Sequence, residues 1–234
     1  MSPNNLPVKK RIDLLDAWRG TAVIVMAAWH FAWDLGSAAV FPLSRMFEAP
    51  ATAVRYFIVG SFLLLSGISA RLSRSNLRRG LRTLGCALAV TAVTYLAKDP
   101  VLFGILHLLG CCMLLYAAVK KPFERVNAPL AAGICLALFL LTFRVPDLRV
   151  QNPWTWVFGF RTEAFYSSDY YPLLPWGFLF FFGAAAGSRA RDLPEIQCPA
   201  WLCGIGRHAL AIYLIHQPVL VVLTGLLTGY YPWN

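Results

Sequence analysis

The sequence has 234 residues, of which 58% are hydrophobic and only 14% are charged. Soluble domains are about 45–50% apolar and about 25% charged, so this composition excludes a soluble globular domain. The net charge of +10 would suggest nucleic acid as a partner of a soluble protein. Here the basic residues fall in short loops between apolar runs, the pattern that orients membrane helices, so nucleic-acid binding is not expected.

Seven apolar runs are predicted to cross the membrane as helices, because backbone groups in lipid must pair within their own segment. Proline marks several of the breaks between them. The sequence therefore predicts an all-α, polytopic helix bundle that forms a single transmembrane domain over residues 1–234. The predicted spans are about 14–40, 52–70, 81–97, 101–119, 126–143, 173–188 and 202–229.

The distribution of Lys and Arg sets the expected orientation. Fifteen of the 21 fall on the side that holds the N-terminus, and six fall on the other side. This asymmetry predicts a cytoplasmic N-terminus, and seven spans then put the C-terminus outside. The longest loop, 144–172, is then extracytoplasmic. Its many aromatic residues fit either a binding surface or a belt at headgroup level.

The first predicted helix holds the richest set of ionisable residues, which are functional candidates when they lie within a membrane. His30 and Asp34 are four residues apart, so the carboxylate could fix the tautomer of the imidazole. Arg19 and His30 are eleven residues apart, or about three turns and 16 Å along one helix face. An extended ligand could bridge them. Alternatively, Arg11, Asp16 and Arg19 are interfacial anchors and His30 is a core residue.

Two further histidines lie within predicted spans. His107 is near the outer end of the fourth span, at the predicted depth of His30, and the alternative for it is a simple interhelical hydrogen bond. His216 lies well inside the last span, just before Pro218. At the cytoplasmic edge, Arg207 and His208 could meet phosphate or act only as positive-inside anchors. Six cysteines show no CxxC pair and no zinc-like spacing with histidine, so no metal site is expected.

Four segments in order resemble the catalytic domain of the heparan-alpha-glucosaminide N-acetyltransferase family of transmembrane acyltransferases, including its bacterial relatives. The Arg19-x10-His30 spacing is also similar to a motif of the acyltransferase-3 group. The segments are Arg11-x4-Asp16-x2-Arg19-Gly20, Phe62-Leu-Leu-Leu-Ser66-Gly67-Ile-Ser69, Asp169-Tyr-Tyr-Pro172-Leu-Leu-Pro175-Trp176 and Gly206-Arg207-His208-x4-Tyr213-x2-His216.

The resemblance implies an acyltransferase in the bacterial plasma membrane that takes acetyl-CoA from the cytoplasm. Its acceptor is an amino sugar or another glycan on the far side of the membrane. Membrane lipid surrounds the protein. His30 matches the family's catalytic histidine, and Asp34 and His107 are expected to support it. The expected donor-binding residues are Arg11, Asp16, Arg19, Arg71, Arg207 and His208. The expected acceptor-binding residues are Arg161, Glu163, Asp169, Tyr170 and His216.

Two other functions stay open on the sequence. A small transporter could use His30, His107 and His216 as a proton or ion path, although no inverted repeat is evident. A noncatalytic scaffold for a membrane assembly is the other alternative. The sequence leaves open whether the chain forms a homo-oligomer.

Overall fold

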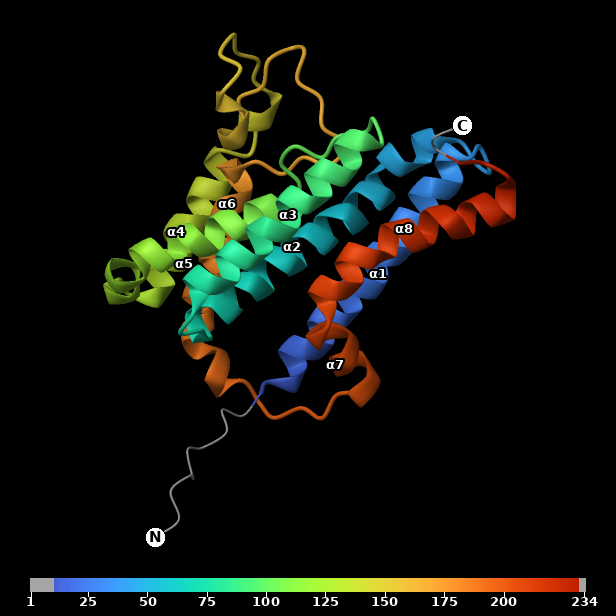
Figure 1. Cartoon of the computed structure of the whole chain (residues 1–234). Coiled ribbons are helices and arrows are strands. Elements are labelled where there is room, and N and C mark those ends of the chain that lie inside the picture. The colour runs from blue at the N-terminus through green and yellow to red at the C-terminus, as the bar shows by residue number, and fades with distance from the viewer. Residues whose placement is uncertain (1–10, 232–234) are drawn as a thin grey trace.

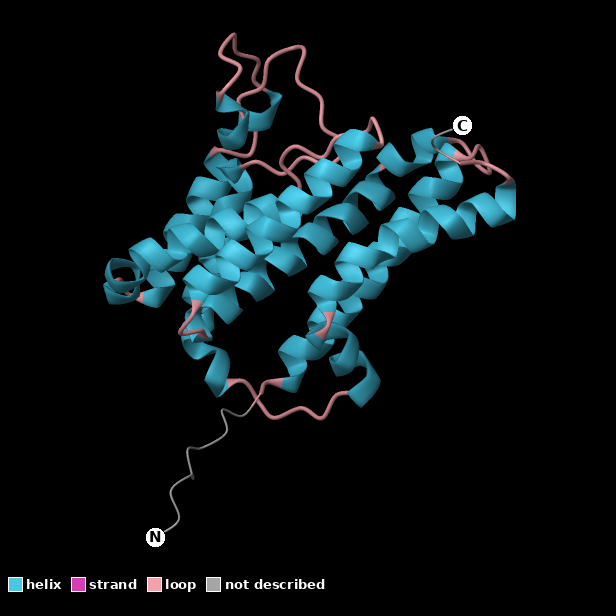
Figure 2. Ribbon diagram, in the orientation of Figure 1, coloured by secondary structure: helices cyan, strands magenta, loops and turns pink. Residues whose placement is uncertain are grey.

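The computed structural model describes residues 11–231, and within this range the chain is a bundle of helices joined by loops (Figures 1 and 2). The predicted all-α class is therefore confirmed. The helices are α1 (Asp13–Ser37), η1 (Leu43–Phe47), α2 (Ala49–Leu72), α3 (Asn76–Leu96), α4 (Ile105–Arg125), α5 (Ala128–Leu141), η2 (Val145–Asp147), η3 (Thr155–Phe158), α6 (Leu173–Ala186), η4 (Gly187–Asp192), α7 (Ala200–Arg207) and α8 (Ala209–Thr228), where η marks a 3-10 helix.

Helix α2 lies between two groups of helices, with α1, α7 and α8 on one side and α3 to α6 on the other (Figure 1). The connections alternate between the two ends of the bundle. The start of α1, the α2–α3 turn and the segment before α7 lie at one end, which is called here the inner end because the charge distribution predicts that it faces the cytoplasm. The 144–172 loop and the end of α8 lie at the other, the outer end (Figure 1). Helices that cross a bilayer back and forth have this arrangement.

Two main apolar clusters hold the helices together, and a third, smaller one joins α1, α2 and η4. The larger joins α2, α3, α4 and α6, and the side chains of Tyr116 and Phe180 within it are fully buried. The second main cluster joins α1 to α2 and α8, around the buried Met26 of α1 and Phe62 of α2. Because lipid is as apolar as these side chains, close van der Waals packing contributes most of the stabilisation.

Four segments within residues 11–231 are long and apolar enough to cross a membrane: Ala49–Leu72, Ile105–Arg125, Ala128–Asp147 and Ala209–Thr228. The chain is therefore a multi-pass membrane protein. Helices α1 and α3 have sufficient length but also carry polar groups, such as His30 and Asp34 in α1 and Arg78 and Arg79 in α3. Helix α6 has only 14 residues before it continues as η4. The count of seven spans stays a prediction.

The last predicted span, 202–229, is two helices rather than one. The backbone of His208 leaves the helical region, at φ −100° and ψ 14°, and this residue separates α7 from α8. Helix α7 then packs along the first turns of α1. A Cβ atom on Gly206 would collide with the carbonyl oxygen of Asp16, and one on Gly20 would collide with that of Leu202. Glycine at both positions therefore permits the close α1–α7 contact.

The 144–172 loop is held against the segment that leads into α4. The backbone N–H of Ser168 donates to the carbonyl of Pro100 at 3.1 Å, and that of Tyr171 donates to the carbonyl of Phe103 at 2.9 Å. The ring of Trp156 contacts Phe103. These contacts place the end of the loop, including the Asp169-Tyr-Tyr-Pro172 motif, directly over the outer ends of α4 and α6.

Candidate functional site

A pocket of about 270 Å³ opens at the inner end of the bundle, between the start of α1, the end of α2 and η4. Three of the residues predicted to bind the donor, Arg11, Asp16 and Arg19, come together in its wall, and Arg191 of η4 joins them. Three guanidinium groups against one carboxylate give the pocket an excess of positive charge. Such a pocket favours an anionic ligand. Its lining is Arg11, Ile12, Leu15, Asp16, Arg19, Ser69, Leu72, Ser73 and Arg191.

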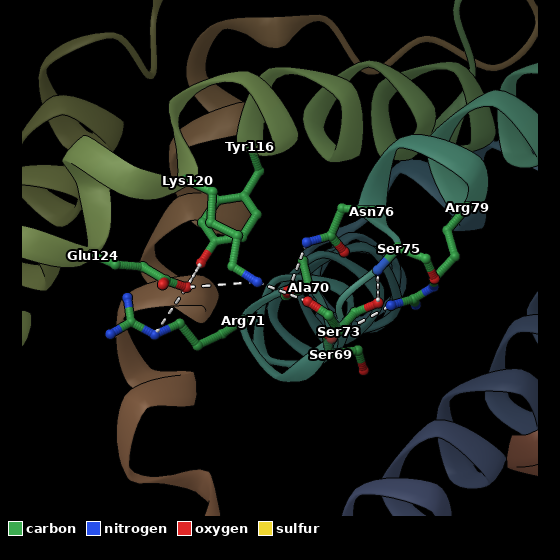
Figure 3. Close-up of polar contacts among 10 residues, drawn as sticks. All are labelled: Ser69, Ala70, Arg71, Ser73, Ser75, Asn76, Arg79, Tyr116, Lys120 and Glu124. Atoms are coloured by element: carbon green, nitrogen blue, oxygen red, sulfur yellow. Dashed lines mark hydrogen bonds and ion pairs between the residues drawn. The ribbon is translucent and has the colours of Figure 1, made fainter.

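Arg19 is held in a fixed position within this pocket. Its Nη1 donates to Oδ1 of Asp16 at 2.8 Å, and its Nη2 donates to Oγ of Ser69 at 2.9 Å. Arg79 of α3 reaches the same place and donates to the carbonyl oxygen of Ser69 at 3.3 Å (Figure 3). Two guanidinium groups thus converge on the last turns of α2, with Asp16 as the acidic partner of Arg19.

The structure places Arg71 in a different network. Its Nε lies 3.5 Å from Oε1 of Glu124, which also accepts a hydrogen bond from the hydroxyl of Tyr116 at 3.0 Å. Lys120 lies 3.8 Å from the same carboxylate oxygen and donates to the carbonyl of Ser73 at 2.7 Å (Figure 3). This network ties the end of α2 to the end of α4, so Arg71 joins these helices and is not part of the pocket lining.

Arg207 and His208 lie at the junction of α7 and α8, and both are exposed. Neither belongs to the lining of the inner pocket. Their part in the local fold is to end α7, because His208 donates its backbone N–H to the carbonyls of Gly204 and Ile205. The structure therefore brings together three of the six predicted donor-binding residues, and places the other three elsewhere.

In the outer half of α1, His30 has a different partner from the one expected. Its Nδ1 lies 2.9 Å from the carbonyl oxygen of Met26, and since a carbonyl only accepts, Nδ1 carries the proton of the neutral ring. The Asp34 carboxylate accepts two hydrogen bonds from Nε2 of Gln217, at 3.0 and 3.1 Å. Asp34 thus joins α1 to α8, and the His30 ring contacts those of Trp29 and His216.

His216 of α8 is buried against His30, with ring centroids 4.9 Å apart and planes at 74°. Its Nδ1 donates to the carbonyl of Tyr213 at 2.6 Å, and its Nε2 is buried without a hydrogen-bond partner. The Tyr213 ring lies 5.4 Å from the His216 ring. The structure therefore joins a residue predicted for acceptor binding to the predicted catalytic histidine.

His107 lies in a different part of the bundle. Its Nε2 is 3.1 Å from Oγ1 of Thr91 in α3, and that hydroxyl donates its own proton to the carbonyl of Val101. The imidazole must then donate to the hydroxyl. The ring also stacks on Phe103. These contacts correspond to the interhelical hydrogen bond that the sequence left open as an alternative.

Two of the residues predicted to bind the acceptor, Arg161 and Tyr170, stabilise the outer loop, and a third, Glu163, lies at its surface. Arg161 donates from Nε and Nη2 to the carbonyl of Pro146, and its guanidinium lies over the ring of Tyr170. The hydroxyl of Tyr170 donates to the carbonyl of Trp156, and burial raises its pKa to about 12. Glu163 is 84% exposed, at 3.8 Å from Arg149. Of these three side chains, only that of Glu163 is exposed.

Asp169 connects the loop to the helices below it. Its Oδ2 accepts the backbone N–H of Ile105 at 3.2 Å, which caps the start of α4. Burial raises the pKa of Asp169 to about 6, while the N–H of Ile105 and the nearby charge of Arg55 act in the opposite direction. Asp169 and Tyr171 also lie close enough to Tyr213 to act on it electrostatically. Asp169 therefore lies near Tyr213, whose ring contacts that of His216.

Replacing Asp169 with asparagine is expected to change how stability depends on pH. Because the folded-state pKa is about 6 against a usual 3.8, the carboxyl stabilises the fold when neutral, and that contribution is lost as pH rises from about 4 to about 6. The melting temperature of the purified wild type should therefore fall as pH rises across this window, while that of Asp169→Asn should not show this fall. The control is Asp147→Asn, because Asp147 lies exposed in the same loop. The same dependence of melting temperature on pH in the wild type and both variants would contradict the raised pKa of Asp169.

Sequence reasoning missed several residues that the structure adds to the site. The sequence places Arg191 and Arg79 only among the basic residues of short loops, whereas in the fold Arg191 lines the inner pocket and Arg79 donates to the backbone of Ser69 beside it. Arg55 was counted as an outer-side basic residue, yet its Nε is buried without a hydrogen-bond partner near Asp169. Tyr213 is part of a recognised motif, and its position one turn before His216 was the available signal.

One family model matches the chain: heparan-alpha-glucosaminide N-acetyltransferase, catalytic, over residues 11–218. The match begins in the inner pocket and ends just after His216, so it includes both parts of the site described above. No curated protein and no solved structure matches the chain.

Proposed function

The chain belongs to the heparan-alpha-glucosaminide N-acetyltransferase catalytic-domain family, and from that premise we propose that it transfers an acetyl group across the membrane. The donor is acetyl-CoA bound from the cytoplasm. The acceptor is an amino sugar or another glycan on the extracytoplasmic side. Membership in a family of acetyltransferases supports the reaction type, while the donor, the acceptor and the sidedness are proposed here from the site.

One observation carries the proposal: a single helix, α1, contributes both to a basic pocket at the inner end and, through the half-buried His30, to an imidazole pair nearer the outer end. Arg19 lines the pocket, and His30 contacts His216. Eleven residues of helix separate Arg19 from His30 by about 16 Å. A long ligand with phosphates at one end and a reactive thioester at the other fits this separation of the Arg19 guanidinium from the His30 imidazole.

The inner pocket is suited to the phosphates of acetyl-CoA. Arg11, Arg19 and Arg191 supply the positive charge, and guanidinium groups bind phosphate through paired N–H donors. Asp16 fixes the guanidinium of Arg19 at 2.8 Å, and Ser69 holds its other nitrogen. A guanidinium held in this way loses less conformational freedom when the ligand binds.

The chemistry at the outer half follows from the tautomer of His30. Since Nδ1 donates to Met26, Nε2 of the neutral ring carries the lone pair and is the general base. It takes the proton of the acceptor's amine or hydroxyl as that nucleophile attacks the thioester carbonyl. The new bond to the acetyl carbon forms as the carbon–sulfur bond breaks, and the proton returns to the departing thiolate. An imidazole suits this role because its usual pKa lies near operating pH.

The transporter alternative receives less support from the structure. A histidine path would need His107 near the other two histidines, but His107 donates to Thr91 on the α3–α4 side of the bundle. The contact between His30 and His216 alone provides a local pair and no path from one end of the bundle to the other.

Binding of acetyl-CoA to detergent-purified protein tests the proposal. At 100 times its dissociation constant, a ligand that binds only the folded state stabilises it by about 2.7 kcal/mol. We expect acetyl-CoA to raise the melting temperature clearly. Acetyl-pantetheine, which lacks the nucleotide phosphates, should not raise it. Labelled acetyl-CoA with a panel of amino sugars then identifies the acceptor. A protein that ignores acetyl-CoA and transfers no label to any of them would overturn the proposal.

A further inference from the structure

Two buried histidines of this bundle differ in how their ring nitrogens are satisfied. His107 makes a hydrogen bond from Nε2 to Thr91, as a structural histidine should. His216 satisfies only Nδ1, through Tyr213, and its buried Nε2 has no partner. Leaving a buried polar atom unsatisfied costs the desolvation free energy of that atom. The unsatisfied Nε2 of His216 lies in a ring that contacts the proposed catalytic His30, which indicates a function for this atom.

The two rings in contact have the same tautomer. His30 and His216 each donate from Nδ1 to a backbone carbonyl of their own helix, that of Met26 and that of Tyr213. Each neutral ring therefore presents Nε2 as a lone pair. Two lone pairs cannot bond to each other until a proton arrives, so the pair is ready to hold one.

His216 is also the neighbour that can stabilise a protonated His30. The rings in contact with His30 are those of Trp29 and His216, and the indole nitrogen of Trp29 is a donor already used by the carbonyl of Ala51. Asp34, the nearest carboxylate on α1, is bound to Gln217. Of the two rings in contact with His30, only that of His216 offers a free acceptor nitrogen, Nε2.

We propose that His216 is the proton-sharing partner of His30, so that the two imidazoles act together as one base. The inference rests on the proposed function and adds to it. The acceptor's N–H or O–H bond breaks, its proton goes to Nε2 of His30, and Nε2 of His216 accepts a hydrogen bond from the N–H that forms. After the carbon–sulfur bond breaks, the pair gives that proton to the thiolate. His216 is thus a positioning residue that acts through His30.

Other titratable groups around the pair must be considered in any test that varies pH. On α1 the nearest is Asp34, and on α8 it is Tyr213. Beyond Tyr213 lie Asp169 and Tyr171 of the outer loop, and Arg55 of α2 acts on both of them. A change in the pH profile is therefore assigned to His216 only by comparison with variants at that position.

The test uses two substitutions at His216 and one control. In His216→Asn, the amide nitrogen can still donate to Tyr213, but the acceptor at Nε2 is lost. In His216→Gln, the amide oxygen reaches the place of Nε2. His107→Asn removes the other buried imidazole, which contacts Thr91. Turnover of acetyl-CoA with glucosamine as the probe acceptor is measured against pH, together with the melting shift caused by acetyl-CoA.

We expect His216→Asn to lower kcat by about a hundredfold, the low end of what proton-transfer groups contribute. The KM for acetyl-CoA and the melting shift should stay as in the wild type, and the acid limb of the kcat profile should move. His216→Gln should recover part of the rate. His107→Asn should leave the acid limb in place. A His216→Asn protein with wild-type kcat and an unmoved acid limb would overturn the inference.

A second readout separates failure of the inference from failure of the proposed function. If the wild type shows no turnover, the acyltransferase proposal fails, but ¹⁵N-histidine NMR of the protein in nanodiscs still tests the pair. The response of the His30 resonances to pH should change in His216→Asn and not in His107→Asn. An unchanged response in His216→Asn would show that the two rings share no proton.

Discussion

Replacing His30 with alanine is expected to lower acetyl-CoA turnover by at least about a hundredfold while the protein stays folded. A positioned general base contributes about 10²- to 10⁴-fold, and His30 presents the lone pair of Nε2 because Nδ1 is committed to Met26. Turnover of labelled acetyl-CoA is measured with glucosamine as acceptor. Melting temperature and the shift caused by acetyl-CoA are measured on the same samples.

The control for this substitution is His107→Ala, which removes an imidazole of the same size that is buried at the α3–α4 contact. It should cost stability but leave the rate per folded molecule close to that of the wild type. His30→Ala should show the opposite pattern. Undiminished turnover in folded His30→Ala protein would remove His30 from the site, and with it the role proposed for His216.

Replacing Arg19 with glutamine is expected to raise the KM for acetyl-CoA by about ten- to a hundredfold, with a smaller effect on kcat. Hydrogen bonds to charged groups are worth about 1.5–3 kcal/mol, and a factor of ten in affinity corresponds to about 1.4 kcal/mol. Within residues 11–231, Arg19 is the one pocket-lining arginine whose guanidinium is hydrogen-bonded to Asp16 and Ser69. Its loss should therefore affect donor binding most.

Because Arg19 also joins α1 to α2 through Ser69, its substitution could act through the fold. Arg191→Gln provides the second variant, since Arg191 lines the same pocket and its side chain is exposed. The exposed Arg45 of η1, near the other end of α1, is the matched control. A KM that stays at the wild-type value in both Arg19→Gln and Arg191→Gln would exclude this pocket as the donor site.

The sequence allowed much of the fold to be predicted, because long apolar runs in this composition have few alternatives to membrane helices. The predicted first span, 14–40, corresponds to α1 at Asp13–Ser37. The break at His208 could not be foreseen in the same way. An apolar run gives no sign of a one-residue interruption, and the cause lies in the contact between Gly206 and α1.

The candidate site was predicted best where its residues are local in sequence. Arg11 lies just before α1, Asp16 and Arg19 lie in its first two turns, and all three line one pocket. Helical spacing, however, gives neighbours only along the same helix, so it paired His30 with Asp34. The actual partners, His216 for His30 and Gln217 for Asp34, come from α8. Contacts between distant segments depend on packing, which a single sequence does not reveal.

The central claim is that an acetyl group passes from a donor at the inner end to an acceptor at the outer end through His30. Proteoliposomes test it most directly, with labelled acetyl-CoA on the side of the inner end and glucosamine enclosed on the other. Label should appear in the enclosed amino sugar with the wild type and not with His30→Ala. Label that reaches glucosamine only when both substrates are on the same side would contradict the claim.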